Sequence, residues 1–422
     1  MATSYAEMVE PAAAEIPDPK PWRFILGYGA AQTGAFICFI PLLTTLLPGK
    51  AEMIGGADKA VLLGQVAMIG GLVAAIGNLL FGMLSDRTQG RFGRRRPWIV
   101  AGLAGVAVSM VLISRADGPV GLLVAVIVFQ LAVNAVYAPL TALVPDVVPD
   151  SRKGLVSAWA GIALPVATLF TALAIVPLAG AIAWQFGLVV AAAGLLILPF
   201  AVTLREPRRP AIRKRLSASL EALKDRNFSL AFASRLLMEG AVAIHTLYLL
   251  FFLQGRSAGL DGRAPAQAFA LLLIVGTVAA TTSGFLGGVA SDRLRSRRPL
   301  VIAGGLCMAG GLGLLVSGPV WPALLAAQLL FGVGHGLHAT TVAAMTAEIL
   351  PHPEAAGRDL GVMNIAIALP QSLAPAVAAA LLGLGATLGS VFAVASLAAL
   401  AACLALLPMR RKPAADQVPG FT

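Results

Sequence analysis

The chain has 422 residues, of which 58% are hydrophobic and only 12% are charged, and its formal net charge is +11. A soluble protein of this length carries about twice that charged fraction. The apolar residues fall into about a dozen runs, each near the length of about 20 residues that spans a bilayer. This composition excludes an ordinary soluble domain and predicts an all-α membrane protein that crosses the bilayer many times.

The apolar runs predict twelve transmembrane helices, with polar or basic loops between them. In chain order, they cover residues 22–47, 60–84, 97–114, 120–144, 155–178, 183–204, 227–254, 266–290, 299–317, 321–346, 360–382 and 387–407. The midpoint of this pattern is interrupted by a polar, basic stretch, so we predict two six-helix bundles. The predicted parts are a disordered cytoplasmic tail (1–21), the first bundle (22–204), a basic cytoplasmic linker (205–226), the second bundle (227–407) and a cytoplasmic tail (408–422).

The basic residues are distributed unequally between the two sides of the predicted membrane. About 25 Lys and Arg lie in the two tails and in the loops after even-numbered helices, against about five in the other loops. Because basic loops stay on the cytoplasmic side, we predict that both termini are cytoplasmic. Residues 1–21 lack the basic start of a secretory signal. The bias toward Ala, Gly and Arg indicates a bacterial protein, and hence the inner membrane.

One loop motif occurs twice, half a chain apart. The run Gly82-Met-Leu-Ser-Asp-Arg leads through a basic loop to Pro97-Trp98, and Gly288-Val-Ala-Ser-Asp-Arg leads likewise to Pro299. A basic loop can bind nucleic acid, but the apolar flanks favour a loop held at a membrane surface. The repeat predicts two equivalent halves, as in transporters that bind substrate between their halves.

The acidic and proline residues repeat with the same spacing. Asp146 ends the predicted helix 120–144, and Glu348 ends the helix 321–346. Each is followed by proline and then arginine, at Arg152 and Arg358. Pro165 and Pro370 form a further pair, which supports the duplication.

Residues 82–98, with the form Ser-Asp-Arg-Thr-x-x-Arg-x-Gly-Arg-Arg-Arg-Pro-Trp, resemble the loop between helices 2 and 3 of the major facilitator superfamily. The form is most similar to its sugar:cation symporter branches, which include sucrose carriers and glycoside-pentoside-hexuronide symporters. The segments Val144-Pro-Asp and Ser234-Arg-Leu-Leu are similar to that group too. The resemblance covers essentially the whole chain and implies a major facilitator fold that works by alternating access.

The resemblance also implies a gate on the cytoplasmic side. Asp86 would cap the end of the helix at 60–84, and arginines would bridge to Asp146. A weaker counterpart would form in the second half. The expected gating residues are Gly82, Asp86, Arg87, Arg91, Arg94, Arg95, Arg96, Asp146, Arg152, Asp292, Arg293, Glu348 and Arg358. The alternative is that these charges only set the topology.

Polar residues within a membrane are costly, so their positions are informative. Large polar side chains gather in the predicted helices 22–47, 120–144, 227–254 and 321–346, which line the cavity in the superfamily. Gln130, Asn134 and Tyr137 share one helix face, where they can hydrogen-bond a hydroxyl-rich substrate or a neighbouring helix. The expected substrate-binding residues are Gln32, Gln130, Asn134, Tyr137, His335, His338, Asn364 and Gln371. Gln328 is a weaker candidate.

Arg235 and Glu239 lie one turn apart in the helix 227–254, with Glu239 about 18 Å into that helix. A charge at that depth costs about 3 kcal/mol or more unless it is paired or hydrated. The pair can be a structural ion pair, or Glu239 can bind and release a proton as the pair breaks. We expect proton coupling by Glu239, Arg235 and His245. The sodium site of melibiose-type permeases needs acids that the helices 22–47, 60–84 and 120–144 lack.

No metal, cofactor or enzyme signature is found in the sequence. Cys38, Cys307 and Cys403 each lie in a different apolar segment, without metal-ligand spacing. His335 and His338 share a face but no carboxylate or cysteine accompanies them. We expect no cofactor, no metal, no catalysis and a monomer. The favoured function is proton-coupled symport of a sugar, glycoside or similar hydrophilic solute. The alternatives are an efflux antiporter of the same fold and a non-transporting sensor or assembly factor.

Overall fold

The computed structural model describes residues 21–178, 181–204, 206, 220–256, 259–294, 297–318, 320–351 and 356–409. Throughout these residues the regular structure is helical, with no strand. The chain divides into two compact units, of which the first holds residues 1–59 and 69–214 and the second holds residues 60–68 and 215–422. Residues 1–20 and 410–422 of the two tails, and residues 205 and 207–219 of the linker, lie outside the described residues.

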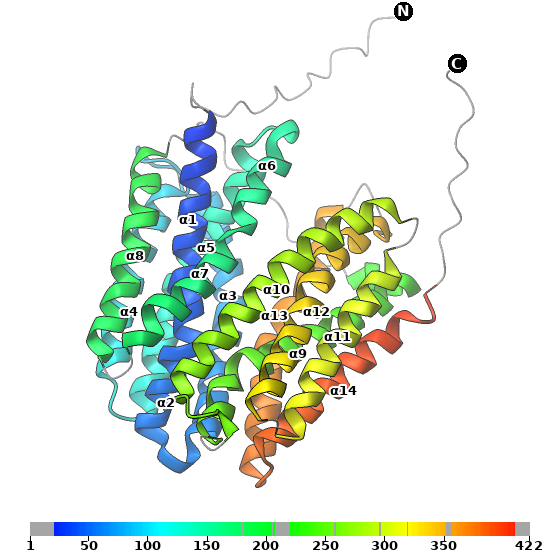
Figure 1. The fold of residues 1–422 in the computed structure, drawn as a ribbon. Helices are drawn as coiled ribbons and strands as arrows, with labels where there is room; N and C mark the ends of the chain where they lie inside the picture. The colour runs from blue at the N-terminus through cyan, green and yellow to red at the C-terminus, as the bar shows by residue number, and fades with distance from the viewer. Residues whose placement is uncertain are drawn as a thin grey trace, which may run out of the picture. The chain divides into compact units, whose positions relative to one another are not determined.

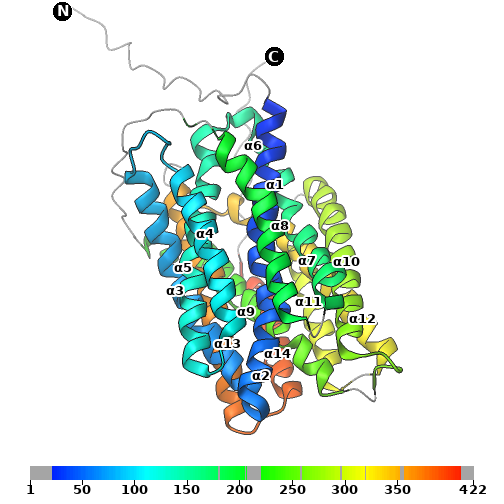
Figure 2. The same cartoon turned by 90° about the vertical axis from the view of Figure 1, so that its left-hand side faces the viewer.

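The first half of the chain (blue to green in Figure 1) contains the helices α1 to α8. They are α1 (Pro21–Pro41), α2 (Leu47–Gly55), α3 (Lys59–Arg87), α4 (Arg96–Arg115), α5 (Pro119–Val147), α6 (Asp150–Gly161), α7 (Ala163–Phe170) and α8 (Ile182–Thr203). Within the first unit, α1 packs against α5, α7 and α8, and α4 packs against α5 and α8 (Figure 2).

The second half contains the helices α9 to α14 (Figure 1). They are α9 (Arg226–Gln254), α10 (Pro265–Arg293), α11 (Arg298–Val316), α12 (Trp321–Glu348), α13 (Ala356–Gly383) and α14 (Leu388–Leu406). Within the second unit, α12 packs between α10 and α11, and α9 packs against α13 and α14.

Ten helical segments of the described chain are long and apolar enough to cross a membrane. The first of them runs from Trp22 to Arg87 and contains α1 to α3. The helix α12 has the necessary length, but Gln328, His335 and His338 lower its hydropathy. The prediction of an all-α membrane protein that crosses the bilayer many times is confirmed.

The predicted helix 155–178 is interrupted in the structure. α6 ends at Gly161, and α7 begins at Ala163. Pro165 explains the position of the break, because its ring lacks an N–H and collides with the carbonyl four residues earlier. The predicted helix 22–47 changes to a π-helical turn at Leu42–Leu46 before α2, directly after Pro41.

Glycines set equivalent close contacts in the two units. A Cβ at Gly102 in α4 would lie 2.8 Å from the Ala132 carbonyl oxygen and 2.8 Å from the Val136 nitrogen of α5. A Cβ at Gly304 in α11 would lie 2.8 Å from the His338 nitrogen of α12. Gly102 and Val136 are as far apart in the sequence as Gly304 and His338. Small residues let membrane helices approach closely, so this repeated contact gives packing evidence for the duplication.

The first turns of α3, residues 60–68, group with the second unit. Gly64 accounts for this grouping, since a Cβ there would lie 2.5 Å from the Tyr248 hydroxyl and 2.8 Å from the Pro375 carbonyl oxygen. The Tyr248 hydroxyl also donates to the Ala60 carbonyl, at 3.4 Å. The first bundle predicted at 22–204 therefore contributes one end of α3 to the second unit.

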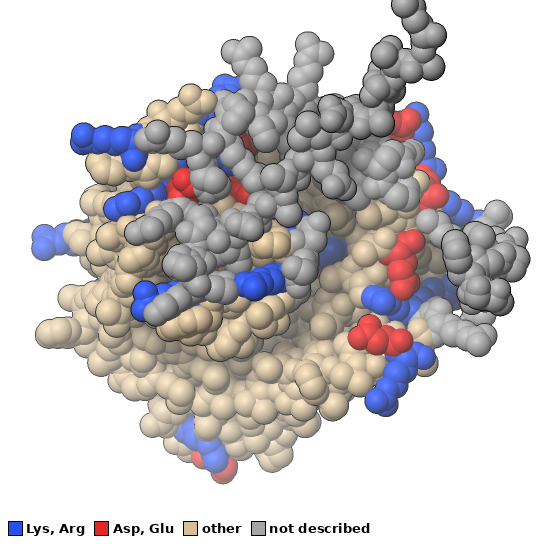
Figure 3. Space-filling view, turned by 90° about the horizontal axis from the view of Figure 1, so that it is seen from above, with Lys and Arg blue, Asp and Glu red and all other residues tan. Residues whose placement is uncertain are grey.

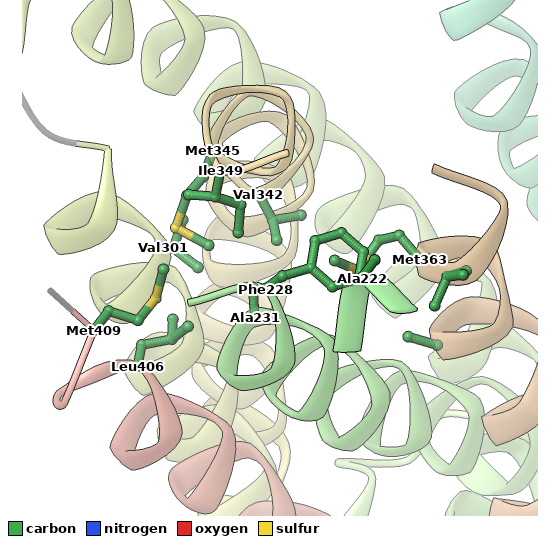
Figure 4. Close-up of a cluster of buried hydrophobic side chains, with 12 residues drawn as sticks. Ala222, Phe228, Ala231, Val301, Val342, Met345, Ile349, Met363, Leu406 and Met409 are labelled. Atoms are coloured by element: carbon green, nitrogen blue, oxygen red, sulfur yellow. The ribbon is translucent and has the colours of Figure 1, made fainter. Parts of the chain in front are cut away.

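A cluster of buried hydrophobic side chains packs several helices of the second unit against one another (Figure 4). Phe228 of α9 lies in it with Val301 of α11, Met345 of α12 and Leu406 of α14. Ala222, from the short 3₁₀ helix Leu220–Lys224 that ends the linker, is fully buried in the same cluster. The linker's last turn is thus packed into the second unit just before α9 begins.

Candidate functional site

The polar face of α5 forms hydrogen bonds and ring contacts within the first unit. The Asn134 side-chain nitrogen donates to the Gln130 carbonyl at 2.8 Å, and its side-chain oxygen accepts from Asn78 of α3 at 3.3 Å. The Tyr137 ring packs edge-on against Phe36 of α1, with the ring centroids 6.0 Å apart. Asn134 and Tyr137 of α5 therefore contact α3 and α1, respectively.

Two amide oxygens in this first-unit cluster have no hydrogen-bond partner in the described chain. The Gln32 nitrogen donates to the Tyr28 hydroxyl at 2.6 Å, while the Gln32 Oε1 is buried and unpartnered. The Gln130 Oε1 is likewise buried and has no hydrogen-bond partner among the described residues. Gln32 and Gln130 are only 4% and 5% exposed. A buried acceptor without a donor is costly, so the cluster offers two places where a ligand hydroxyl can donate.

The helices α9 and α12 carry a polar column in the second unit. A ring nitrogen of His245 lies 3.0 Å from the Gln328 side-chain oxygen, which can only accept, so that nitrogen donates. The Phe331 ring is stacked on His245, with the centroids 3.8 Å apart, and lies nearly parallel to His335 at 6.2 Å. His335 is half-buried, whereas His245 is buried.

The charged end of this polar column holds Arg235, Glu239 and His338. The Arg235 Nε lies 3.9 Å from the nearest Glu239 oxygen, which is beyond hydrogen-bonding distance. The Arg235 Nε and the His338 Nε2 are both buried, and neither has a hydrogen-bond partner in the described chain. Asn364 and Gln371, predicted on the same grounds, are exposed on α13.

A cluster of ion pairs lies where α3, α4 and α5 end or begin in the first unit. The buried Arg95 guanidinium lies 2.5 Å from an Asp86 oxygen and 2.8 Å from an Asp146 oxygen. It also donates to the Ser85 hydroxyl at 2.5 Å, and Arg94 lies 2.5 Å from the same Asp146 oxygen. The residues predicted for the gate that come together here are Asp86, Arg94, Arg95 and Asp146 (the Arg95 cluster).

The other arginines predicted for the gate make no ion pair within the described residues. Arg91 and Arg96 lie over the Phe92 ring, at 4.6 and 5.9 Å from its centroid. Arg87 and Arg152 are exposed. Gly82 takes part through its carbonyl oxygen, which accepts from the Ser85 hydroxyl at 2.9 Å.

The equivalent cluster in the second unit is looser. Arg297 lies 2.8 Å from a Glu348 oxygen but 3.8 Å from an Asp292 oxygen. The Asp292 side chain is 80% exposed. The Ser291 hydroxyl, the counterpart of Ser85, is buried without a partner in the described chain. Arg293 is exposed, and the side chain of Arg358 lies outside the described residues. Figure 3 shows both basic and acidic side chains on the face of the molecule that is seen from above.

Glu206, which is not among the residues predicted from the sequence, caps the start of α4. Its carboxylate accepts the backbone N–H groups of Arg94, Arg95 and Arg96 at 2.8 to 2.9 Å. An anion is stabilised at a helix N-terminus by the unpaired N–H groups and by the helix dipole. The turn needs Gly93, whose φ is +91° and whose Cβ would lie 2.8 Å from a Glu206 oxygen.

Glu206→Ala should lower the stability of the first unit by about 1 to 2 kcal/mol, because three N–H groups lose their acceptor. Glu206→Gln should cost about half as much, because one oxygen remains while the charge is lost. The thermal midpoint of the detergent-solubilised protein measures both. Equal midpoints for wild type and Glu206→Ala would contradict the capping role.

Three further residues of these clusters are absent from the sequence-based predictions. Asn78 and Tyr28 are polar residues inside apolar helices, so the same criterion that selected Gln130 could have selected them. Phe331 could not have been found in this way, since an aromatic residue in an apolar helix is usually only packing. In the part of the chain that the structure describes, no group of three or more His, Cys, Asp or Glu residues could hold a metal ion.

Comparisons with known proteins agree with this fold. The curated relative that matches is an uncharacterised symporter of Synechocystis sp., 33% identical over 140 residues, which are 30% of this chain and 25% of that protein. The chain therefore spans about a quarter of that relative's length.

Among solved structures, the nucleoside transporter NupG is similar, with a TM-score of 0.71 and 13% identity over 91% of this chain and 98% of that chain. A POT family transporter in complex with 5-aminolevulinic acid gives a TM-score of 0.74 at 11% identity, over 91% of this chain and 95% of that chain. A bacterial homologue of the human lysosomal transporter Spinster gives 0.69 at 16% identity, over 92% and 95%. The sequence model of the Major Facilitator Superfamily matches residues 25–320 and 263–421. The chain thus belongs to the Major Facilitator Superfamily of membrane transporters.

Proposed function

We propose that this protein is a proton-coupled symporter of a sugar, glycoside or similar hydroxyl-rich solute, which works by alternating access in a bacterial inner membrane with both termini cytoplasmic. The observation that carries the proposal is the pair of buried, unpartnered oxygens of Gln32 and Gln130. An amide oxygen can only accept, so its ligand partner is a hydrogen-bond donor such as a hydroxyl group. A sugar offers many hydroxyl donors.

The proton role is assigned to Glu239. Its nearest cation among the described residues, the Arg235 Nε, is 3.9 Å away, so no close hydrogen bond from a described cation holds Glu239 in its charged form. Desolvation favours the neutral form of a carboxyl, and a carrier group must be able to take both forms during the cycle. His245 is already bonded to Gln328, so it serves better to order the polar column than to carry the proton.

The gate is assigned to the Arg95 cluster, with the pair Arg297–Glu348 as its weaker counterpart. The support is geometric. Within the described residues, Arg95 has three acceptors within 2.8 Å, whereas Arg297 has one. Such an ion pair has two distinct states. It is either formed with short contacts, or it is broken with both charged groups hydrated.

Uptake of labelled sugars and glycosides into proteoliposomes under an imposed pH gradient tests this function. Accumulation that a proton ionophore abolishes is the expected result. Gln130→Leu should raise the KM for the transported sugar about tenfold, which corresponds to one lost hydrogen bond of about 1.4 kcal/mol. Gln185→Leu is the control, because the Gln185 amide already donates to the Ile175 carbonyl at 3.1 Å.

Extrusion of dyes without uptake of any sugar would contradict the proposal and favour an efflux antiporter. A lack of all transport in a folded preparation would favour a sensor. A KM that rises equally in Gln130→Leu and Gln185→Leu would remove Gln130 from the binding site.

A further inference from the structure

The loop between α3 and α4 lies at one end of the first unit (Figure 2), and contacts between its two ends hold it in shape. The Trp98 Nε1 donates to the Thr88 hydroxyl at 2.8 Å. The Trp98 ring also packs edge-on against Phe81, with the ring centroids 5.5 Å apart. Because both ends are fixed in this way, the loop presents Arg91 and Phe92 from a defined turn.

Two arginines of this loop lie over one exposed aromatic ring. The guanidinium carbon of Arg91 lies 4.6 Å from the Phe92 ring centroid, and that of Arg96 lies 5.9 Å from it. Phe92 itself is 54% exposed. Since a guanidinium is attracted to the face of an aromatic ring, the ring holds two positive charges together at the surface. We call Arg91, Phe92 and Arg96 the phenylalanine clamp.

The positive charge of the phenylalanine clamp is not neutralised by an ion pair within the described residues. The acids that surround the loop are bound elsewhere. Asp86 and Asp146 pair with other arginines in the Arg95 cluster, and Glu206 accepts backbone N–H groups at the start of α4. Like charges that are held close together repel each other. An anion from outside the chain would remove this repulsion.

The surface next to the clamp changes from basic to apolar along both helices. Arg96 and Val100 share one face of α4, and Arg87 and Met83 share one face of α3, because each pair is four residues apart. Val100 and Met83 are each 37% exposed. Both helices are long and apolar enough to cross a membrane. Exposed apolar side chains on such helices face lipid acyl chains, whereas arginines near helix ends reach the headgroups.

We propose that the phenylalanine clamp binds the phosphate group of an anionic phospholipid in the cytoplasmic leaflet. The guanidinium groups form charge-assisted hydrogen bonds with the phosphate oxygens, and the acyl chains lie over the apolar surface of α4 that begins at Val100. A zwitterionic phospholipid has the same phosphate, but its own cation competes with the arginines. Soluble phosphate has the charge but no acyl chains. The site does not depend on which solute the protein transports.

Native mass spectrometry of the full-length protein in detergent, titrated with single phospholipids, tests this site. The probes are palmitoyl-oleoyl-phosphatidylglycerol and palmitoyl-oleoyl-phosphatidylcholine, which differ only in the headgroup. Wild type should bind the first phosphatidylglycerol about tenfold more tightly than the first phosphatidylcholine. Each arginine near an anionic headgroup contributes about fivefold, so the double variant Arg91→Gln/Arg96→Gln should lose this preference.

The double variant Lys224→Gln/Arg226→Gln is the matched control, because it removes two exposed positive charges from the start of α9 and the turn before it. It should keep the preference for phosphatidylglycerol. Phe92→Ala leaves every charge in place, but the guanidinium groups lose the ring that positions them. It should therefore weaken phosphatidylglycerol binding about threefold. The thermal midpoint of each variant without added lipid should equal that of wild type.

Equal affinities of wild type for the two phospholipids would overturn the site. Equal losses in the arginine double variant and its control would do so too, since the total charge alone would then explain binding. Unchanged binding in Phe92→Ala would show that the ring does not position the arginines, and the clamp would be rejected. Inorganic phosphate that displaces phosphatidylglycerol at equal concentration would replace the lipid by a soluble anion. None of these outcomes bears on solute transport, so the proposed function is tested separately.

Discussion

Arg95→Gln should destabilise the first unit by about 3 kcal/mol, the largest loss expected for any single change in the ion-pair clusters. The Arg95 side chain is 4% exposed and neutralises Asp86 and Asp146 together, while it also holds the Ser85 hydroxyl. Removing the guanidinium leaves two carboxylates close to one another, and Arg94 is then the one described residue that pairs with Asp146. Asp86 is 45% exposed and can be hydrated, which keeps the cost at the lower end of the range for broken buried ion pairs.

Arg297→Gln in the second unit is the matched control for Arg95→Gln. Arg297 occupies the same place before its helix, but its side chain is 23% exposed and only its contact with Glu348 is short. Exposed pairs contribute about 0 to 1 kcal/mol, so a loss of about 1 kcal/mol or less is expected. Thermal unfolding of each variant in detergent, followed with hydrogen exchange at the start of α4 and of α11, compares the two. Equal losses would show that the asymmetry between the clusters has no energetic meaning.

The helices are predicted well from the sequence because their lengths are fixed by the membrane. The range 227–254 corresponds to α9 at Arg226–Gln254, and the range 321–346 corresponds to α12 at Trp321–Glu348. What hydropathy does not predict is a change of helix type inside an apolar run. The break before Pro165 and the π-helical turn after Pro41 both lie beside prolines, but Pro370 and Pro375 lie inside the continuous helix α13, so a proline alone does not predict such a change.

The candidate site, too, is predicted only in part from the sequence. A polar residue in an apolar helix is visible in the sequence, which predicts Gln130, Asn134, Arg235 and Glu239 as candidate site residues. The sequence does not say which polar atoms remain unpartnered. Asn134 is bonded on both sides of its amide, whereas the Gln130 Oε1 is open. That difference depends on side-chain rotamers and on neighbours from other helices.

Glu206 illustrates a contact that no local pattern predicts. Its carboxylate binds backbone N–H groups, so its three partners carry no signal in their own side chains. The partners also lie more than a hundred positions earlier in the chain. A glutamate just after an apolar helix looks like any solvated loop residue, and only the fold brings it to the start of α4.

Glu239→Gln should abolish proton-driven accumulation of the substrate while it preserves exchange of labelled for unlabelled substrate across the membrane. Glutamine has nearly the same shape and can still face Arg235, but it cannot bind and release a proton. The carrier should therefore still bind and cross between its two open states, but uphill transport should fall by a factor of ten or more. Accumulation ratios and counterflow rates in the same proteoliposomes measure the two properties separately.

Asp261→Asn provides the control, because it removes one carboxylate charge and one ion pair from the same unit without touching the polar column. Asp261 is 73% exposed and pairs with Arg263, and its φ of +54° is one that asparagine tolerates. This variant should accumulate substrate as wild type does. Unchanged accumulation in Glu239→Gln would remove Glu239 from the proton path, and loss of exchange together with accumulation would reduce the Arg235–Glu239 pair to a structural contact. Loss of accumulation alone is the pattern that only a titrating group produces, because binding and the conformational cycle then remain intact while the coupling to the pH gradient is gone.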